Sequence, residues 1–195
     1  YEAGDTIQEM DAQGYDQATR DLLGQRLAHM MYRQIFTFHA VHADPNPANF
    51  AFRKSVQVVM YDFGCVKVSP PDDAAAYRDT MRAFRDRDHA AIQRGLERNG
   101  LQRAGAVVAD QAAIYDEVWD SFGPLLFEDR DFDFATAMNH TIFARVILKG
   151  LKRPRQFQPA ASILFTDRAQ TGHYTNMKDM RARFNVMPLG AGALA

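Results

Sequence analysis

The sequence predicts a mainly α-helical fold of the α+β class, and three observations lead to this prediction. A long stretch near the amino end, residues 16–39, has the apolar periodicity of a helix. Two short apolar runs follow, residues 49–52 and 56–61, and both have the length of strands. Beyond them, residues 71–185 are largely periodic in the manner of helices. Together these patterns predict a small β-hairpin within a helical domain.

The helix expected at 16–39 has a start signal and a continuous apolar stripe. Asp16 is a suitable N-cap, because its carboxylate can accept a hydrogen bond from a free amide of the first turn. The methionine pair in the stripe is expected to fill the core rather than to line a ligand pocket. Before the helix, residues 1–14 are polar and contain two glycines, which indicates a lead-in segment. The stripe recurs at spacings of three and four residues: Leu23, Leu27, Met30, Met31, Ile35 and Phe38.

A proline-containing loop joins this helix to the expected hairpin. Pro45 and Pro47 fix their own φ angles and disfavour helical conformation in the residues before them, so the loop is expected to be extended. The second run of the hairpin, 56–61, is rich in β-branched and apolar residues, as a buried strand should be. Asp62 directly follows that run, and a hairpin would return it to the neighbourhood of Asn49.

This order of polar residues is suited to phosphoryl transfer. The transferred group carries spread negative charge, so catalysis depends mainly on positioning and charge neutralisation. Asp44 would face the attacking hydroxyl or water, while Asn49 and Asp62 would supply the hard oxygen ligands that Mg²⁺ prefers. Phe63 and Gly64 complete the turn after Asp62 and are expected to help bind the nucleotide. The sequence therefore predicts a magnesium-nucleotide site over residues 40–66.

Each half of the pattern alone is also typical of an ordinary turn. Asp and Asn beside prolines are common turn residues, and Asp followed closely by Gly is common in loops. The functional interpretation depends on finding both halves in this order with strands between them. His42 is also a catalytic candidate. We expect it to support the conformation of the loop rather than to transfer a proton. His39 is interpreted as a helix-end residue.

The loop and turn resemble those of the UbiB/AarF family of atypical kinase-like proteins. The family loop reads His-Ala-Asp-Pro-His-Pro-Gly-Asn and its turn reads Leu-Asp-Phe-Gly. The loop here departs at Asn46 and Ala48, neither of which is an expected metal ligand. Tyr1–Gly4 also resembles the residues that follow the hinge between kinase lobes. The positions that match are His42, Ala43, Asp44, Pro45, Pro47, Asn49, Asp62, Phe63 and Gly64.

The resemblance implies the carboxyl-terminal lobe of a protein-kinase-like fold over residues 1–195. Residues 1–14 would be a hinge remnant, 40–66 the catalytic loop and metal turn, and 71–185 the helical region, with the amino-terminal lobe absent. The family implies ATP and Mg²⁺ as cofactors, and phosphoryl transfer or ATP hydrolysis linked to quinone or isoprenoid lipid metabolism. Without the missing lobe, which clamps the phosphates, this chain alone is expected to be catalytically weak.

Two other functions remain open on the sequence alone. Aminoglycoside and choline phosphotransferases resemble the chain through the same Asp-to-Asn loop and a similar metal turn. A catalytically silent pseudokinase scaffold is the rival from another class. Only a short segment separates Gly64 from the helix expected at residue 71, which leaves no evident room for a phosphorylated activation segment. This spacing favours a small-molecule or lipid acceptor, or water.

Composition excludes several broad classes. The chain has 195 residues, 47% of them hydrophobic and 24% charged, which is typical of a globular domain. Its formal net charge of −1 argues against a nucleic-acid partner. The only cysteine, Cys65, allows no internal disulfide, fits a reducing compartment and is expected to be buried. We therefore predict a cytoplasmic protein with peripheral membrane contact as a further possibility.

The carboxyl-terminal half is expected to be a series of helices. Gly123-Pro124 is expected to end one helix, and the tail after residue 186 is expected to fray. The aspartates between 129 and 133 are interpreted as a solvated turn rather than a calcium loop. The basic run 149–155 is interpreted as a charged loop, with acidic lipid head groups as the alternative. The expected helices cover 71–86, 88–99, 108–122, 135–151, 158–172 and 175–185.

Overall fold

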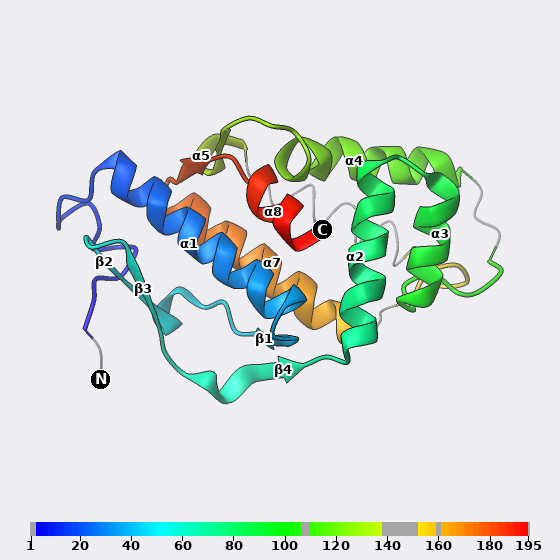
Figure 1. The fold of residues 1–195 in the computed structure, drawn as a ribbon, viewed down its shortest axis with the longest axis horizontal. Coiled ribbons are helices and arrows are strands. Elements are labelled where there is room, and N and C mark those ends of the chain that lie inside the picture. Colours follow the sequence, from blue (N-terminus) through cyan, green and yellow to red (C-terminus); the bar gives the residue numbers. More distant parts are fainter. Residues whose placement is uncertain (1–2, 107–109, 138–151, 159–160, 195) are drawn as a thin grey trace.

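The computed structural model describes residues 3–106, 110–137, 152–158 and 161–194 (Figure 1). Two long helices, α1 (Gln17–Phe36) and α7 (Ala161–Asp179), lie side by side at its centre. The strands within residues 40–68 lie at one side of this pair, and the helices between residues 71 and 126 lie at one end of the molecule. The helical and small-strand content agrees with the predicted fold class.

Helix α1 begins where the sequence predicts. Asp16 is its N-cap, and the Asp16 side chain accepts a hydrogen bond from the Thr19 amide at 2.8 Å. The helix ends at Phe36, three residues before the predicted end, with Thr37 as its C-cap. Leu23, Leu27 and Met31 are fully buried, so this part of the predicted apolar stripe faces the core. Phe38, the last predicted member, lies beyond the end of α1 and is 55% exposed.

Six short elements follow α1 and bring the polar loop against the hairpin. Strands β2 and β3 pair antiparallel, with Phe50 opposite Met60. Strands β1 and β4 also pair antiparallel, with His42 opposite Val66, a pairing that the sequence pattern does not predict. The elements are β1 (Ala40–His42), the 3₁₀ turn η1 (Pro47–Asn49), β2 (Phe50–Arg53), β3 (Gln57–Met60), the 3₁₀ turn η2 (Phe63–Cys65) and β4 (Val66–Val68).

The amino-terminal lead-in is packed against the hairpin. Asp5 and Phe52 exchange two backbone hydrogen bonds of 2.8 Å, and the Tyr15 hydroxyl donates to the Asp5 carboxylate at 2.7 Å. Ile7 and Met10 are buried in the main core. This segment therefore forms part of the domain, despite its polar composition.

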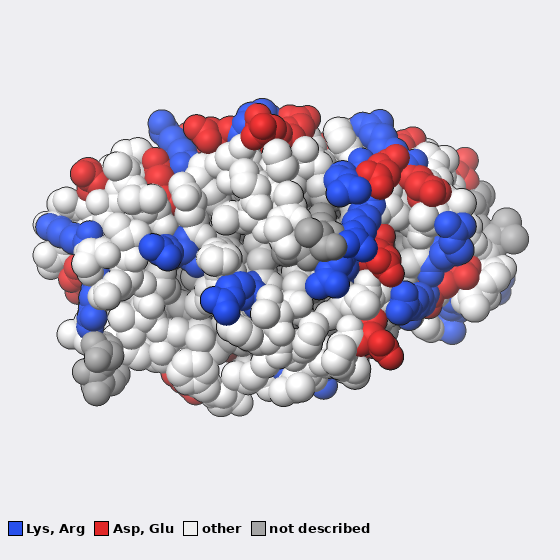
Figure 2. Space-filling model, viewed as in Figure 1, with Lys and Arg blue, Asp and Glu red and all other residues white. Residues whose placement is uncertain are grey.

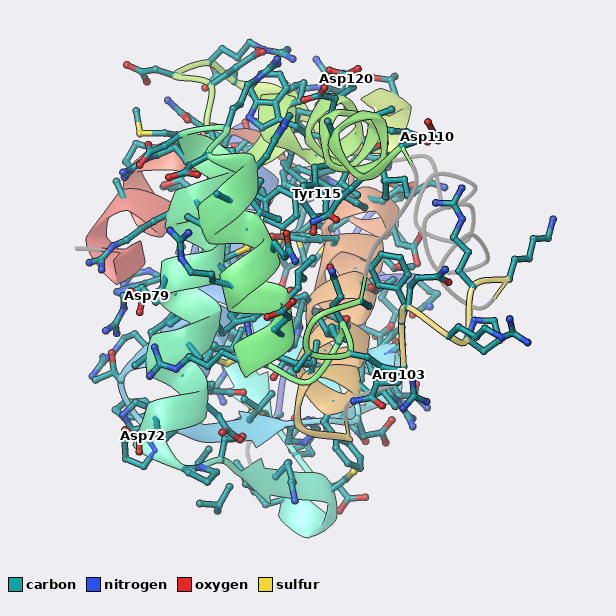
Figure 3. All side chains as sticks on the ribbon, turned by 90° about the vertical axis from the view of Figure 1, so that its right-hand side faces the viewer. Asp72, Asp79, Arg103, Asp110, Tyr115 and Asp120 are labelled. Carbon is teal, nitrogen blue, oxygen red and sulfur yellow. The ribbon has the colours of Figure 1, made fainter. Side chains whose placement is uncertain are left out.

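Helices α2 (Pro71–Arg85), α3 (His89–Arg98) and α4 (Gln111–Leu126) form the end of the molecule that Figure 3 faces. The predicted break at Gly123-Pro124 is wrong, because α4 continues through Pro124 to Leu126. Leu125 is buried in the main core, and this packing outweighs the hydrogen bond that proline removes. Tyr115 points inward from α4, whereas Asp120 lies on its outer side (Figure 3).

The carboxyl-terminal region differs from the prediction in two ways. Helix α7 is continuous to Asp179, where the sequence predicts two helices, because Tyr174 and Met177 are buried against α1 and carry the helix through the expected gap. The tail expected to fray forms α8 (Met187–Leu194), anchored by Val186, which is 1% exposed. The other elements here are β5 (Phe132–Asp133), α5 (Phe134–Ala137) and β6 (Arg183–Phe184).

The helix predicted at 135–151 lies mostly outside the described residues, and so does part of the basic run 149–155. The main core is built around α1, α7, β2 and the segment before α8. A smaller second cluster contains Ala83, Ile92 and Tyr115. Within the described residues, no helix is both long and apolar enough to cross a membrane.

Candidate active site

His42 is a buried support between the loop and the metal turn. Its backbone amide donates to the Gln34 side chain at 2.9 Å, and its Nε2 lies 2.8 Å from the backbone oxygen of Asp62. A carbonyl can only accept, so Nε2 carries the proton in this contact. The ring also packs edge-on against Phe50 and Phe63, and the residue is 1% exposed. This environment favours the bracing role over proton transfer.

Asp44 and Asn49 are joined directly across the loop. The Asn49 amide nitrogen donates to the Asp44 carboxylate at 2.8 Å and to the Asp44 backbone oxygen at 3.2 Å. Asn46 caps the turn η1, with its side chain accepting from the Ala48 amide at 3.0 Å. The residue that departs from the UbiB/AarF pattern therefore has a local structural role. The Asp44 side chain remains 35% exposed, so an incoming group can reach it.

Asp62 is exposed and has an unusual backbone conformation. Its φ of 49° lies in the left-handed region, which Asp tolerates better than most residues. One carboxylate oxygen accepts from the Gly64 amide at 3.0 Å. The Tyr61 amide donates to the Asn49 backbone oxygen at 2.8 Å, so the hairpin connects this turn to the loop. His42 is thus hydrogen-bonded to Asp62, and Asn49 is hydrogen-bonded to Tyr61, the residue before Asp62.

The exposed position of Cys65 corrects a prediction. The sequence predicts a buried Cys65, but its side chain is exposed. The backbone of this residue provides the structural contact instead, because its carbonyl accepts from the Ala43 amide at 2.8 Å. The pairing of β1 with β4 therefore uses Cys65 without burying its thiol.

Helix α7 contributes a residue that the motif does not assign to the site. The Arg168 guanidinium lies 3.5 Å from the second carboxylate oxygen of Asp44, although 124 positions separate the two residues. Arg168 is 62% exposed, so the guanidinium is open to solvent as well. Both oxygens of Asp44 therefore have a partner, Asn49 for one and Arg168 for the other. Sequence spacing could not reveal this contact, because it depends on how α7 packs.

The available donors fit magnesium better than a softer metal. Asn49 uses its amide nitrogen on Asp44, which leaves its side-chain oxygen as a possible ligand. Asp62 is exposed and uses one carboxylate oxygen on Gly64. Magnesium keeps several waters and needs few protein ligands, all of them oxygen. No group of three or more His, Cys, Asp or Glu residues suited to a metal occurs in the described part of the chain, so a cage built by such side chains is not present there.

Two titratable groups on α7 have shifted pKa values, and one of them, His173, lies behind the loop. His173 is fully buried, and burial together with the nearby His42 lowers the pKa of His173 to about 3. Its ring packs edge-on against Phe50, and neither ring nitrogen has a hydrogen-bond partner within the described residues. Burial raises the pKa of Asp167 to about 6. In both groups burial therefore disfavours the charged form of the side chain.

Comparison with known proteins supports the kinase-like interpretation. Residues 1–96 match the sequence model of the ABC1 atypical kinase-like domain, which covers the loop, the hairpin and the metal turn. This match supports a relationship to the atypical kinase family.

The fold is similar to that of Rv3197 from Mycobacterium tuberculosis, a protein solved in complex with erythromycin. The two chains are 19% identical, with a TM-score of 0.69. The similarity covers 97% of this chain but 46% of the other, so this chain spans less than half of its length. At this identity the likeness shows the fold alone. The placement within the UbiB/AarF family stays a prediction.

Proposed function

We propose that this chain carries the magnesium and catalytic-loop half of an atypical kinase or ATPase. The observation that carries the proposal is the linked arrangement of Asp44, Asn49 and Asp62. Asn49 bonds to Asp44 directly, and His42 connects the same loop to the backbone of Asp62. The reaction would be transfer of the terminal phosphoryl group of ATP to a small acceptor, or to water.

Each residue has a definite part in this proposal. Asp44 would orient the acceptor hydroxyl or water and accept its proton, since its carboxylate is accessible. Asn49 and Asp62 would hold magnesium through oxygen, and Phe63 and Gly64 would form the wall of the nucleotide site. When bound, magnesium would offset the charge on the phosphate oxygens. His42 would keep loop and turn in register through Asp62.

An apolar acceptor is the version of this proposal that the surface favours. Phe63 is 60% exposed directly beside the metal turn, and Val66 and Val68 of β4 are 41% and 69% exposed. The face around β4 is largely uncharged in Figure 2. Such a surface suits an isoprenoid or quinone intermediate, or contact with a membrane surface, better than an aminoglycoside. A cytoplasmic protein that touches membranes peripherally fits this version.

The first test is thermal unfolding of the full-length protein with and without Mg-ATP. A ligand that binds only the native state raises the unfolding free energy by about 2.7 kcal/mol at 100 times its Kd. We expect a magnesium-dependent rise in midpoint that Asp62→Asn abolishes. Asp131→Asn is the matched control, because Asp131 is exposed and lies far from the loop in sequence.

The outcomes separate the rival functions. A rise that requires both magnesium and Asp62, followed by release of inorganic phosphate or phosphorylation of an isoprenoid acceptor, supports the proposal. Phosphorylation of an aminoglycoside or choline would favour the small-molecule phosphotransferase instead. Binding without turnover would support the pseudokinase scaffold. Equal behaviour of Asp62→Asn and Asp131→Asn would contradict the assignment of the metal turn.

A further inference from the structure

Helix α7 contacts the catalytic loop over successive turns. Arg168, Gly172 and Asn176 are spaced four residues apart, so they lie on one face of the helix. Arg168 meets Asp44, and Gly172 and Asn176 both meet Pro45. Two consecutive loop residues, Asp44 and Pro45, therefore rest on one face of α7.

Gly172 allows this close approach. A Cβ atom at position 172 would lie 2.0 Å from the Cγ atom and 2.4 Å from the Cβ atom of Pro45. Proline is rigid, so these atoms cannot rotate away as the end of a flexible side chain could. Glycine within a helix costs about 1 kcal/mol relative to alanine. Gly172 therefore lowers the helix propensity of α7 at this position. Its missing side chain allows α7 and the loop to lie in direct contact.

Asn176 holds the same loop residue from the next turn of the helix. Its side-chain nitrogen donates to the Pro45 backbone oxygen at 3.0 Å, and the residue is 1% exposed. This hydrogen bond is costly to break on the Asn176 side, because the buried amide has no water to replace its partner. Pro45 is thus located by a steric contact on its ring and a hydrogen bond on its carbonyl.

The remaining contacts of Asp44 would not place it as firmly against the core. Its ion pair with Arg168 is long and exposed, and exposed pairs contribute about 0–1 kcal/mol. Its bond to Asn49 lies within the loop itself and moves with the loop. Pro45 is the residue next to Asp44. Its contacts with Gly172 and Asn176 fix this part of the loop against α7.

We propose that Gly172 and Asn176 are positioning residues, which set the location of the Asp44 carboxylate through Pro45. This inference rests on the proposed function for its effect on turnover, but not for its effect on the loop. A displacement of about 1 Å at a reacting group can reduce the rate about 100-fold. A change at Gly172 is therefore expected to act mainly on kcat, while the nucleotide still binds.

The test compares Gly172→Ala with Gly192→Ala in the full-length protein. Both replace a helical glycine, but a Cβ at position 192 meets nothing within 4 Å. We expect Gly172→Ala to lower kcat for ATP turnover about 10- to 100-fold, measured well below its unfolding midpoint. The Mg-ATP midpoint shift should be retained, and Gly192→Ala should turn over like the parent protein. Asn176→Asp, which replaces the donor with an acceptor, should lower kcat in the same way.

A second substitution distinguishes a steric clash between position 172 and Pro45 from a general loss of packing. Pro45→Gly removes the two atoms that a Cβ at position 172 would strike. The further loss of kcat caused by Gly172→Ala should be several-fold smaller in the Pro45→Gly background than in the parent protein. An equal loss in both backgrounds would contradict the proposal, since a merely structural defect would not depend on Pro45.

Hydrogen exchange distinguishes failure of this inference from failure of the proposed function. The Ala43, Ala48 and Asn49 amides are hydrogen-bonded within the loop region. We expect faster exchange at these amides in Gly172→Ala and Asn176→Asp, with no change in Gly192→Ala. If the parent protein neither binds nor hydrolyses ATP, the proposed function fails, yet this exchange result still decides the positioning role. Unchanged exchange together with unchanged kcat would overturn it.

Discussion

His173 is the residue at which burial has the clearest chemical consequence. It is fully buried behind the loop, and its pKa is lowered to about 3 by burial and by His42. An imidazole in such a place remains neutral in the native state at neutral pH. Its unfolded-state pKa is about 6.5, so the unfolded chain binds a proton more readily.

This difference predicts acid sensitivity with a definite sign. Between about pH 6.5 and pH 3 the unfolded state binds more protons through His173, so stability falls as pH falls. The full effect is on the order of 5 kcal/mol, from about 1.4 kcal/mol per pKa unit. We expect His173→Leu to flatten the dependence of unfolding free energy on pH, measured by urea denaturation at several pH values.

The exposed His29 supplies the control for this measurement. His29→Leu should retain the pH dependence of the parent protein, because His29 lies at the surface of α1. Parallel curves for His173→Leu and the parent protein would show that His173 does not cause the acid sensitivity.

At the scale of elements, Gly24 and Gly172 each allow a close helix contact, and neither position gives a local signal in the sequence. Gly24 of α1 faces the segment around β6, and a Cβ there would lie 2.7 Å from the Ala182 Cβ and 2.8 Å from a Phe184 ring carbon. Gly172 has the same role between α7 and the loop. In both places the small side chain lets elements from distant parts of the sequence approach closely.

Gly24→Ala is therefore expected to destabilise the protein even though alanine favours helix. The gain in helix propensity is about 1 kcal/mol, whereas overpacking a filled core costs about 1–3 kcal/mol. We predict a net loss of up to about 2 kcal/mol in unfolding free energy by urea denaturation. Gly192→Ala, in open space on α8, should be neutral or slightly stabilising. A stabilised Gly24→Ala protein would show that α1 and β6 separate easily.

At the scale of the whole molecule, the two hydrophobic clusters differ greatly in the number of buried residues. The main core joins α1, α7, β2 and the carboxyl-terminal segment. The second cluster, around Ile92 and Tyr115, belongs to α2, α3 and α4 and contains few buried residues. Figure 3 shows these three helices together at one end of the molecule. Local stability is expected to follow the amount of buried apolar contact.

We therefore predict that α3 and α4 open before the central helices. Ile92→Ala should lower hydrogen-exchange protection in α3 and α4 and leave the slowest amides of α1 and α7 nearly unchanged. Met177→Ala, which removes a fully buried side chain from the main core, should lower protection throughout, by about 2–5 kcal/mol. A uniform loss of protection in Ile92→Ala would show that the molecule unfolds as a single unit.

The sequence was sufficient wherever a structural feature depends on neighbouring residues. The Asp16 cap and the start of α2 at Pro71 follow from the chemistry of a few adjacent side chains. The pairing of the runs around Phe50 and Met60 follows from a strand pattern on each side of a short turn. The order of Asp44, Asn49 and Asp62, with strands between them, also predicts a magnesium-nucleotide site, which stays a prediction.

Tertiary structure decided the features that involve distant segments. Helix α4 passes through Pro124 because Leu125 is buried, and α7 has no break because Tyr174 and Met177 pack against α1. The contact of Arg168 with Asp44 likewise depends on where α7 lies. Differences in helix propensity between residues range from a few tenths of a kcal/mol to about 3 kcal/mol for proline. Burying one large apolar side chain contributes about 1.5–3 kcal/mol, so the packing of several can override a local preference for a break.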